Sequence, residues 1–226
     1  MLHKVTYGRR AARAKAGGVI FSCFLLAAGP VLAEERIDIL ALGDSLTQGY
    51  GLLEMNGFVP QLRRWLEDQG TPARVVNAGV SGDTTAGGFA RVEWSLTPEI
   101  DAMIVALGGN DLLRGIAPEV ARANLEGILK VAQANDIDVL LVGMQAPGNY
   151  GPDYKAAFDA MYPELAQAYG ADYAPSFFEG LQSEGQTLRD VADFMQPDGI
   201  HPNADGVARI VDALGPRVQG LMARID

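Results

Sequence analysis

Short apolar runs alternate along this chain with longer segments in which apolar residues recur every three or four positions. The short runs have the length of β-strands and are almost continuously apolar, as in strands buried on both faces of a parallel sheet. The longer segments have the period of amphipathic helices and end at residues typical of helix termini. The pattern predicts strands over 36–42, 73–79, 101–108, 138–145 and 172–178, and helices over 57–69, 85–96, 118–135, 153–169 and 203–223.

This alternation predicts one α/β domain, a three-layer α/β/α sandwich around a mainly parallel, five-stranded sheet. The length of 226 residues suits a single domain, and neither a repeat nor a linker divides it. In open α/β sheets the functional site gathers at the carboxyl ends of the strands. Four polar, glycine-containing segments are predicted to fall at or near that edge: 43–49, 81–85, 108–111 and 197–203.

The first 33 residues differ from the rest of the chain. A basic start is followed by the apolar segment 17–33, which ends in small residues at Val31–Ala33. This order predicts a secretory signal peptide over 1–33, cleaved near Ala33, ahead of one domain over 34–226. A transmembrane anchor is the alternative, but it needs about 20 apolar residues, and this segment is shorter and contains Pro30. We therefore expect a periplasmic or secreted protein without a stable membrane anchor in its mature form.

Cleavage would change the charge and the reactive residues of the chain. It would remove 5 of the 18 Lys and Arg residues and none of the 28 Asp and Glu residues, which leaves a net charge of −15. Such acidity argues against nucleic acid or anionic membrane as a partner. Cys23, the only cysteine, lies in the signal, and lipid attachment there is an alternative that the preceding residues fit poorly. With His3 also removed, His201 alone remains, so a histidine-rich metal site is disfavoured, and no nucleotide-binding glycine motif is present.

Ser45 lies in a glycine-flanked turn after the first predicted strand, and two roles are open to it. Serine is a preferred N-cap of helices, so it could simply begin the next helix. As a nucleophile it would need a base and a group that orients the base. His201 is the remaining histidine, and Asp198 precedes it by three residues, so one loop could present the carboxylate to the imidazole. The alternative for Asp198 and His201 is a turn that leads into the last helix.

Acyl transfer also needs hydrogen-bond donors for the oxyanion of the tetrahedral intermediate. The backbone N–H of Ser45 at a strand-to-helix turn could supply one donor. Gly82 could supply a second through its backbone, and Asn110 a third through its side-chain amide. Each has a structural alternative, since Gly82 could be a loop glycine and Asn110 could form a turn after a strand.

The four polar segments together resemble the conserved blocks of the SGNH, or GDSL-type, hydrolases. The order and spacing agree across almost all of the predicted mature chain, and the similarity is greatest to the multifunctional acyl-thioesterase I / lysophospholipase L1 / arylesterase subfamily. The matching residues are Gly43-Asp44-Ser45-Leu46, Gly82, Gly108-Gly109-Asn110-Asp111 and Asp198-Gly199-Ile200-His201.

This resemblance implies a flavodoxin-like sandwich and a serine esterase and thioesterase that works without cofactor or metal. It implies Ser45 as nucleophile, His201 as general base and acid, and Asp198 as the group that orients the base. The N–H groups of Ser45 and Gly82 and the Asn110 amide would form the oxyanion hole. Asp44 and Asp111 are expected to brace their loops.

The acyl group of a small-molecule ester or thioester needs an apolar groove beside Ser45. Two loops, 111–118 and 144–154, match loops that contact the acyl chain in the subfamily. Their apolar residues could instead cover the edge of the sheet. The candidates for substrate binding are Leu112, Leu113, Ile116, Ala146, Pro147 and Tyr150.

Two rival hypotheses stay open at this stage, and the sequence makes no prediction of the oligomeric state. A carbohydrate O-acetylesterase would use the same triad on the same fold. A non-catalytic binding protein would keep the sandwich alone, although the presence of both Asp198 and His201 disfavours it.

Overall fold

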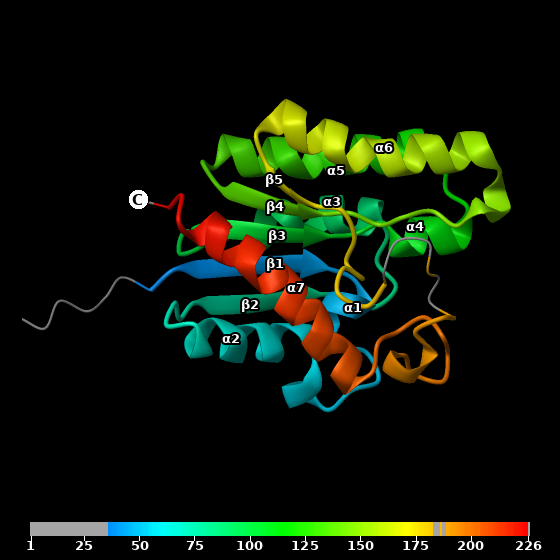
Figure 1. Cartoon of the computed structure of the whole chain (residues 1–226). Helices are drawn as coiled ribbons and strands as arrows, with labels where there is room; N and C mark the ends of the chain where they lie inside the picture. The colour runs from blue at the N-terminus through cyan, green and yellow to red at the C-terminus, as the bar shows by residue number, and fades with distance from the viewer. Residues whose placement is uncertain (1–35, 183–185, 187–188, 226) are drawn as a thin grey trace, which may run out of the picture. The chain divides into compact units, whose positions relative to one another are not determined.

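A five-stranded parallel sheet forms the centre of the domain (Figure 1). The computed structural model describes residues 36–182, 186 and 189–225, so the predicted signal peptide and Cys23 lie outside the described residues. The strand order is β2-β1-β3-β4-β5, and every neighbouring pair is parallel. The predicted α/β sandwich is therefore confirmed. The strands are β1 (Asp38–Gly43), β2 (Arg74–Gly79), β3 (Ala102–Ala106), β4 (Asp138–Val142) and β5 (Asp172–Ala174).

Helices cover both faces of the sheet. Figure 1 shows α7 (Ala204–Met222) crossing in front of the strands and α3 (Thr85–Ser95) behind them. On one face α7 packs against α2 (Phe58–Asp68), and on the other α5 (Pro118–Ala134) packs against both α3 and α6 (Pro152–Tyr169). Every residue of β1 and β3 is buried between these layers, as their continuously apolar sequences predict.

The differences from the sequence prediction lie at the carboxyl edge of the sheet. Strands were expected to continue to residues 108, 145 and 178, but β3, β4 and β5 end at Ala106, Val142 and Ala174. Pro175 directly follows β5 and has no N–H with which to extend a ladder. Two short helices at this edge, α1 (Ser45–Gln48) and α4 (Gly109–Arg114), were not predicted because neither is long enough to show a helical period. Single turns of 3-10 helix also occur, at Glu54–Asn56, Gly148–Tyr150 and Ala192–Phe194.

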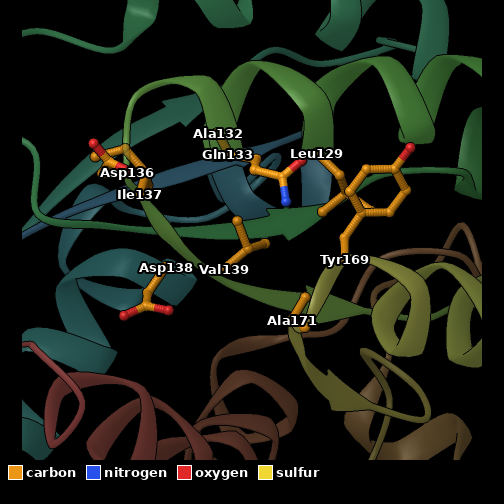
Figure 2. A pocket seen from close by; sticks show the side chains of 10 residues that line it. Leu129, Ala132, Gln133, Asp136, Ile137, Asp138, Val139, Tyr169 and Ala171 are labelled. Atoms are coloured by element: carbon orange, nitrogen blue, oxygen red, sulfur yellow. The ribbon is translucent and has the colours of Figure 1, made fainter.

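A pocket of about 290 Å³ opens at the opposite edge, where the strands begin (Figure 2). It lies between the end of α5, the start of β4 and the turn that connects α6 to β5. Figure 2 shows the carboxylates of Asp136 and Asp138 apart from each other. The pocket is lined by Leu129, Ala132, Gln133, Asp136, Ile137, Asp138, Val139, Tyr169, Gly170 and Ala171.

Candidate active site

The four polar segments follow or adjoin the carboxyl ends of the strands, as predicted. Ser45 begins α1 directly after β1, and Asn110 lies in the first turn of α4 after β3. Gly82 lies in the loop between β2 and α3, and Asp198 and His201 lie in the loop before α7. The parallel topology therefore brings residues from distant parts of the sequence to one edge of the sheet.

Ser45, His201 and Asp198 form a continuous hydrogen-bonded chain. The Nε2 atom of His201 lies 2.9 Å from the Ser45 hydroxyl oxygen. The other ring nitrogen, Nδ1, lies 2.7 Å from Oδ2 of Asp198. With the imidazole proton on Nδ1, the ring donates to Asp198 and leaves Nε2 free to accept from the serine hydroxyl. The sequence spacing suggested this arrangement, and the structure brings the three side chains together.

The Asp198 carboxylate is held in its ionised form by its own loop. Burial raises its pKa, but hydrogen bonds from the backbone N–H groups of His201 and Ile200 and from the His201 ring outweigh that effect. Together they lower the pKa of Asp198 from 3.8 to about 2. The two backbone bonds go to Oδ1 at 3.0 and 2.9 Å, so Oδ2 remains for the imidazole. Asp198 is therefore a permanently charged acceptor at neutral pH.

Two further residues that the sequence did not point to, Tyr50 and Gln196, contact His201. The ring of Tyr50 lies 4.7 Å from the His201 ring, measured between centroids. Gln196 donates from its side chain to the backbone carbonyl of Tyr50 at 2.8 Å, and from its backbone N–H to that of His201 at 2.7 Å. Gln196 thus joins the two loops. Because the contacts of Tyr50 with Gln196 and His201 span about 150 residues of sequence, no local pattern could have indicated them.

Gly82 and Ser45 both present backbone N–H groups at this edge. Within the described residues, neither N–H donates a hydrogen bond to another part of the chain. Gly82 has a φ angle of 84°, in the left-handed region where a side chain would be strained. Its carbonyl oxygen accepts a hydrogen bond from the Arg114 guanidinium at 2.8 Å.

Asn110 is oriented by Asp44, the residue that precedes the serine. The Asn110 amide donates one of its two N–H bonds to Oδ2 of Asp44 at 3.2 Å, and Leu46 N–H donates to Oδ1 at 3.0 Å. Burial raises the pKa of Asp44 from 3.8 to about 6, although these two hydrogen bonds and the nearby His201 oppose the rise. The second N–H of the Asn110 amide remains available to a ligand.

Asp111 binds the first residue of α3, in keeping with the bracing role that the resemblance implies for it. Its two carboxylate oxygens accept from the Thr85 backbone N–H at 2.8 Å and from the Thr85 hydroxyl at 2.6 Å. Asn124 of α5 donates to the same hydroxyl at 3.0 Å. These three buried or half-buried groups fix α3, α4 and α5 relative to one another.

The six candidates for substrate binding have very different exposures. Leu112 and Ala146 are buried in the hydrophobic core cluster, whereas Leu113 is 60% exposed and Tyr150 is 42% exposed. Ile116 is half-buried and Pro147 is exposed. The Tyr150 ring packs on Tyr154, with ring centroids 5.0 Å apart, and lies against Gly115. The loop after α4 therefore contacts the loop after β4.

No group of three or more His, Cys, Asp or Glu residues in the described part of the chain could hold a metal ion. No helix in that part is both long and apolar enough to cross a membrane.

Comparisons with known proteins agree on one family. The family model described as "GDSL-like Lipase/Acylhydrolase family" matches residues 41–209. Esterase TesA of Pseudomonas aeruginosa is 40% identical over 185 residues, which cover 81% of this chain and 89% of TesA. Thioesterase 1/protease 1/lysophospholipase L1 of Escherichia coli is 36% identical over 186 residues, which cover 81% and 84%. The crystal structure of AlinE4, an SGNH-hydrolase family esterase, has a TM-score of 0.67 and 44% identity, and the match covers 82% of this chain and 96% of AlinE4.

Proposed function

Because this chain belongs to the GDSL-like lipase/acylhydrolase family, we propose that it is a serine hydrolase that cleaves carboxylic ester and thioester bonds through an acyl-enzyme. The observation that carries this proposal is the hydrogen-bonded chain from Ser45 through His201 to Asp198. That chain joins a nucleophile, a base and an orienting carboxylate.

In the first half of the reaction, Nε2 of His201 takes the proton of the Ser45 hydroxyl as Oγ attacks the carbonyl carbon. The imidazolium then gives that proton to the departing alcohol or thiol, and an ester links the acyl group to Ser45. In the second half, His201 takes a proton from water as the water oxygen attacks the acyl carbon, and the imidazolium returns that proton to Oγ of Ser45 as the bond between Oγ and the acyl carbon breaks and the acid leaves. Asp198 stays ionised throughout and stabilises the imidazolium at 2.7 Å.

The negative charge on the carbonyl oxygen would be met by three donors, which are the N–H groups of Ser45 and Gly82 and the free N–H of the Asn110 amide. Support for this role comes from the unused backbone N–H groups and from the Asp44 contact that orients the amide. Donors fixed before the reaction stabilise the transition state without a reorganisation cost.

The acyl group would lie toward the loops that follow Asn110 and β4. Exposed Leu113 and Tyr150 are the better candidates to contact it, because buried Leu112 and Ala146 would instead support the loops from below. The relatives are named esterase, thioesterase and lysophospholipase, so we infer small-molecule acyl esters and thioesters as the substrate class. We also infer export of the chain, with cleavage near Ala33, from the sequence of residues 1–33.

Replacing the nucleophile tests this proposal. The Ser45→Ala variant should lose about 10⁴-fold or more of kcat on a p-nitrophenyl ester, and it should not be labelled by a fluorophosphonate. Ser176→Ala is the matched control, because the Ser176 hydroxyl accepts from Phe178 N–H at 3.1 Å in a turn after β5. Turnover or labelling that survives in Ser45→Ala would overturn the assignment.

A further inference from the structure

We propose that Arg91 is a positioning residue that sets the distance between the two backbone donors of the oxyanion hole, the N–H groups of Ser45 and Gly82. The inference rests on the proposed function, because it assigns a role in the same reaction. Arg91 lies on α3 and is not one of the residues that the motifs identified.

One guanidinium contacts both of the loops that carry these donors. Its Nη2 donates to the carbonyl oxygen of Gly43 at 2.8 Å, two residues before Ser45. Its Nε donates to Oδ2 of Asp83 at 2.7 Å, one residue after Gly82. Arg91 therefore joins the turn of the nucleophile to the loop of the second donor.

These contacts complete a closed ring around Gly82. The carbonyl oxygen of Gly43 also accepts from the backbone N–H of Val80 at 3.0 Å, two residues before Gly82. The loop is thus anchored to one carbonyl oxygen on both sides of Gly82, directly through Val80 and through Arg91 by way of Asp83. A carbonyl oxygen can accept two hydrogen bonds, so both anchors can hold at once. Without Arg91, the loop would keep the backbone bond from Asp83 N–H to the Val80 carbonyl at 3.0 Å and the Arg114 contact with Gly82, but Asp83 would lose its link to the Gly43 carbonyl.

Arginine suits this position in a way that lysine would not. The Arg91 residue is only 8% exposed, and its planar fork directs two donors at fixed angles to two acceptors. A lysine ammonium is a single point, and it would satisfy either Gly43 or Asp83 but not both in the same geometry. Replacing arginine with lysine should therefore keep the buried charge and release one loop.

A buried ion pair could also serve stability alone, and the test must separate these two roles. Arg63 on α2 is exposed and controls for the arginine-to-lysine change itself, because its Nε donates to the backbone carbonyl of Val75 at 2.9 Å, and assays well below the unfolding temperature separate the stability role. Val75 lies near the start of β2, away from the carboxyl edge where Ser45 and Gly82 lie. Arg63→Lys weakens the same kind of arginine–carbonyl contact at a site remote from the donors.

The test compares Arg91→Lys with Arg63→Lys, well below the unfolding temperature of both, for hydrolysis of a p-nitrophenyl ester and for the rate of phosphonylation by a fluorophosphonate. We expect Arg91→Lys to lower kcat by about 10- to 100-fold with KM within about threefold, since displacement of aligned groups by an ångström can cost about 10²-fold. Phosphonylation should slow in parallel, because the phosphonyl oxygen uses the same donors. Arg63→Lys should keep both rates within about twofold of the wild type.

Asp83→Asn tests the same link if Arg91→Lys does not fold. It should lower kcat and the phosphonylation rate in the same direction but by less, because the amide oxygen can still accept from Nε of Arg91. The role of Arg91 would be overturned if kcat and the phosphonylation rate stayed within twofold of those of the Arg63→Lys control. This criterion applies to Arg91→Lys or, if that variant does not fold, to Asp83→Asn. A wild-type protein without turnover, or a Ser45→Ala variant that retains it, would instead overturn the proposed function.

Discussion

The two edges of the sheet differ in what they bring together. At the edge where the strands begin, a pocket of about 290 Å³ is open, but its polar groups point to separate partners. Asp138 pairs with Arg224 at 2.7 Å, and the Tyr169 hydroxyl donates to Glu126 at 2.8 Å. At the edge where the strands end, Ser45, His201 and Asp198 converge in one hydrogen-bonded chain. The comparison teaches that convergence of reactive groups, rather than open volume, marks the candidate functional edge.

Replacing one carboxylate at each edge by an amide should give the largest difference in kcat between the two edges. Asp198→Asn should lower kcat by roughly 10³- to 10⁴-fold, because the imidazole loses the charge that orients it and stabilises its protonated form. Asp138→Asn is the matched control, since it also replaces a carboxylate that accepts a hydrogen bond from a basic side chain, in this case Arg224 at 2.7 Å. Steady-state kinetics on one ester checks both. An effect on kcat of similar size in the two variants would remove the distinction.

Replacing one asparagine by alanine at each edge should give a smaller difference in kcat between the two edges. Asn110→Ala should lower kcat by about 10²- to 10³-fold with little change in KM, as for loss of one oxyanion donor. Asn135→Ala should leave kcat unchanged, because among the described residues that amide donates to the Val131 carbonyl near the end of α5, at 2.8 Å. The kcat values of the two variants, measured at one temperature, check this prediction. It would be wrong if Asn110→Ala mainly raised KM.

The buried Asp44 should lower the free energy of unfolding as the pH rises above its raised pKa of about 6. Because its folded-state pKa is raised from 3.8 to about 6, the folded protein holds the proton more tightly than the unfolded chain. That contribution is present below about pH 4 and is lost as the pH rises through about 6. Relative to wild type, the unfolding free energy of Asp44→Asn should therefore rise by about 2–3 kcal/mol between pH 4 and pH 8.

Urea unfolding of both proteins at a series of pH values measures the Asp44 effect directly. A difference in unfolding free energy that does not change with pH would contradict the raised pKa. The kcat of Asp44→Asn in the same series would report separately on the replacement of the carboxylate that accepts from Asn110 by an amide.

The smallest expected effect lies at the pocket edge. Asp136 is the non-glycine residue with a positive φ angle among the described residues, at 55°. Asp136→Gly should relieve that conformation and stabilise the fold by up to about 1 kcal/mol, with kcat unchanged. Thermal unfolding and an ester assay check the two parts. A fall in kcat would mean that the two edges are coupled.

Strands and contacts within one loop could be predicted from the sequence, because neighbouring residues determine them. Contacts between different loops at the edge of the sheet could not. Buried strands are readable from continuous apolar runs, and the Asp198–His201 contact is readable because the two residues share one loop. The strand ends were predicted too far because apolar residues continue past β4 and β5 into loops that cover the edge. The contact between Asp44 and Asn110 spans 66 residues, and its partners carry no periodic signal.

Arg91 illustrates the same limit from inside a helix. On α3 it sits in a predicted helical segment, where an arginine is ordinarily interpreted as a solvated residue. Only the three-dimensional arrangement shows that its side chain is buried between Gly43 and Asp83. Residues that place catalytic groups are therefore harder to predict than the groups themselves.

The Asp198–His201 loop also bears on how the protein assembles. Closing that loop costs little chain entropy, because the two residues are three positions apart. The Ser45–His201 contact, in contrast, closes 156 residues of chain and requires the C-terminal segment to reach the edge of a finished sheet. During refolding, turnover therefore returns only after that segment has reached Ser45. The circular dichroism signal reports helix formation, which can precede this step.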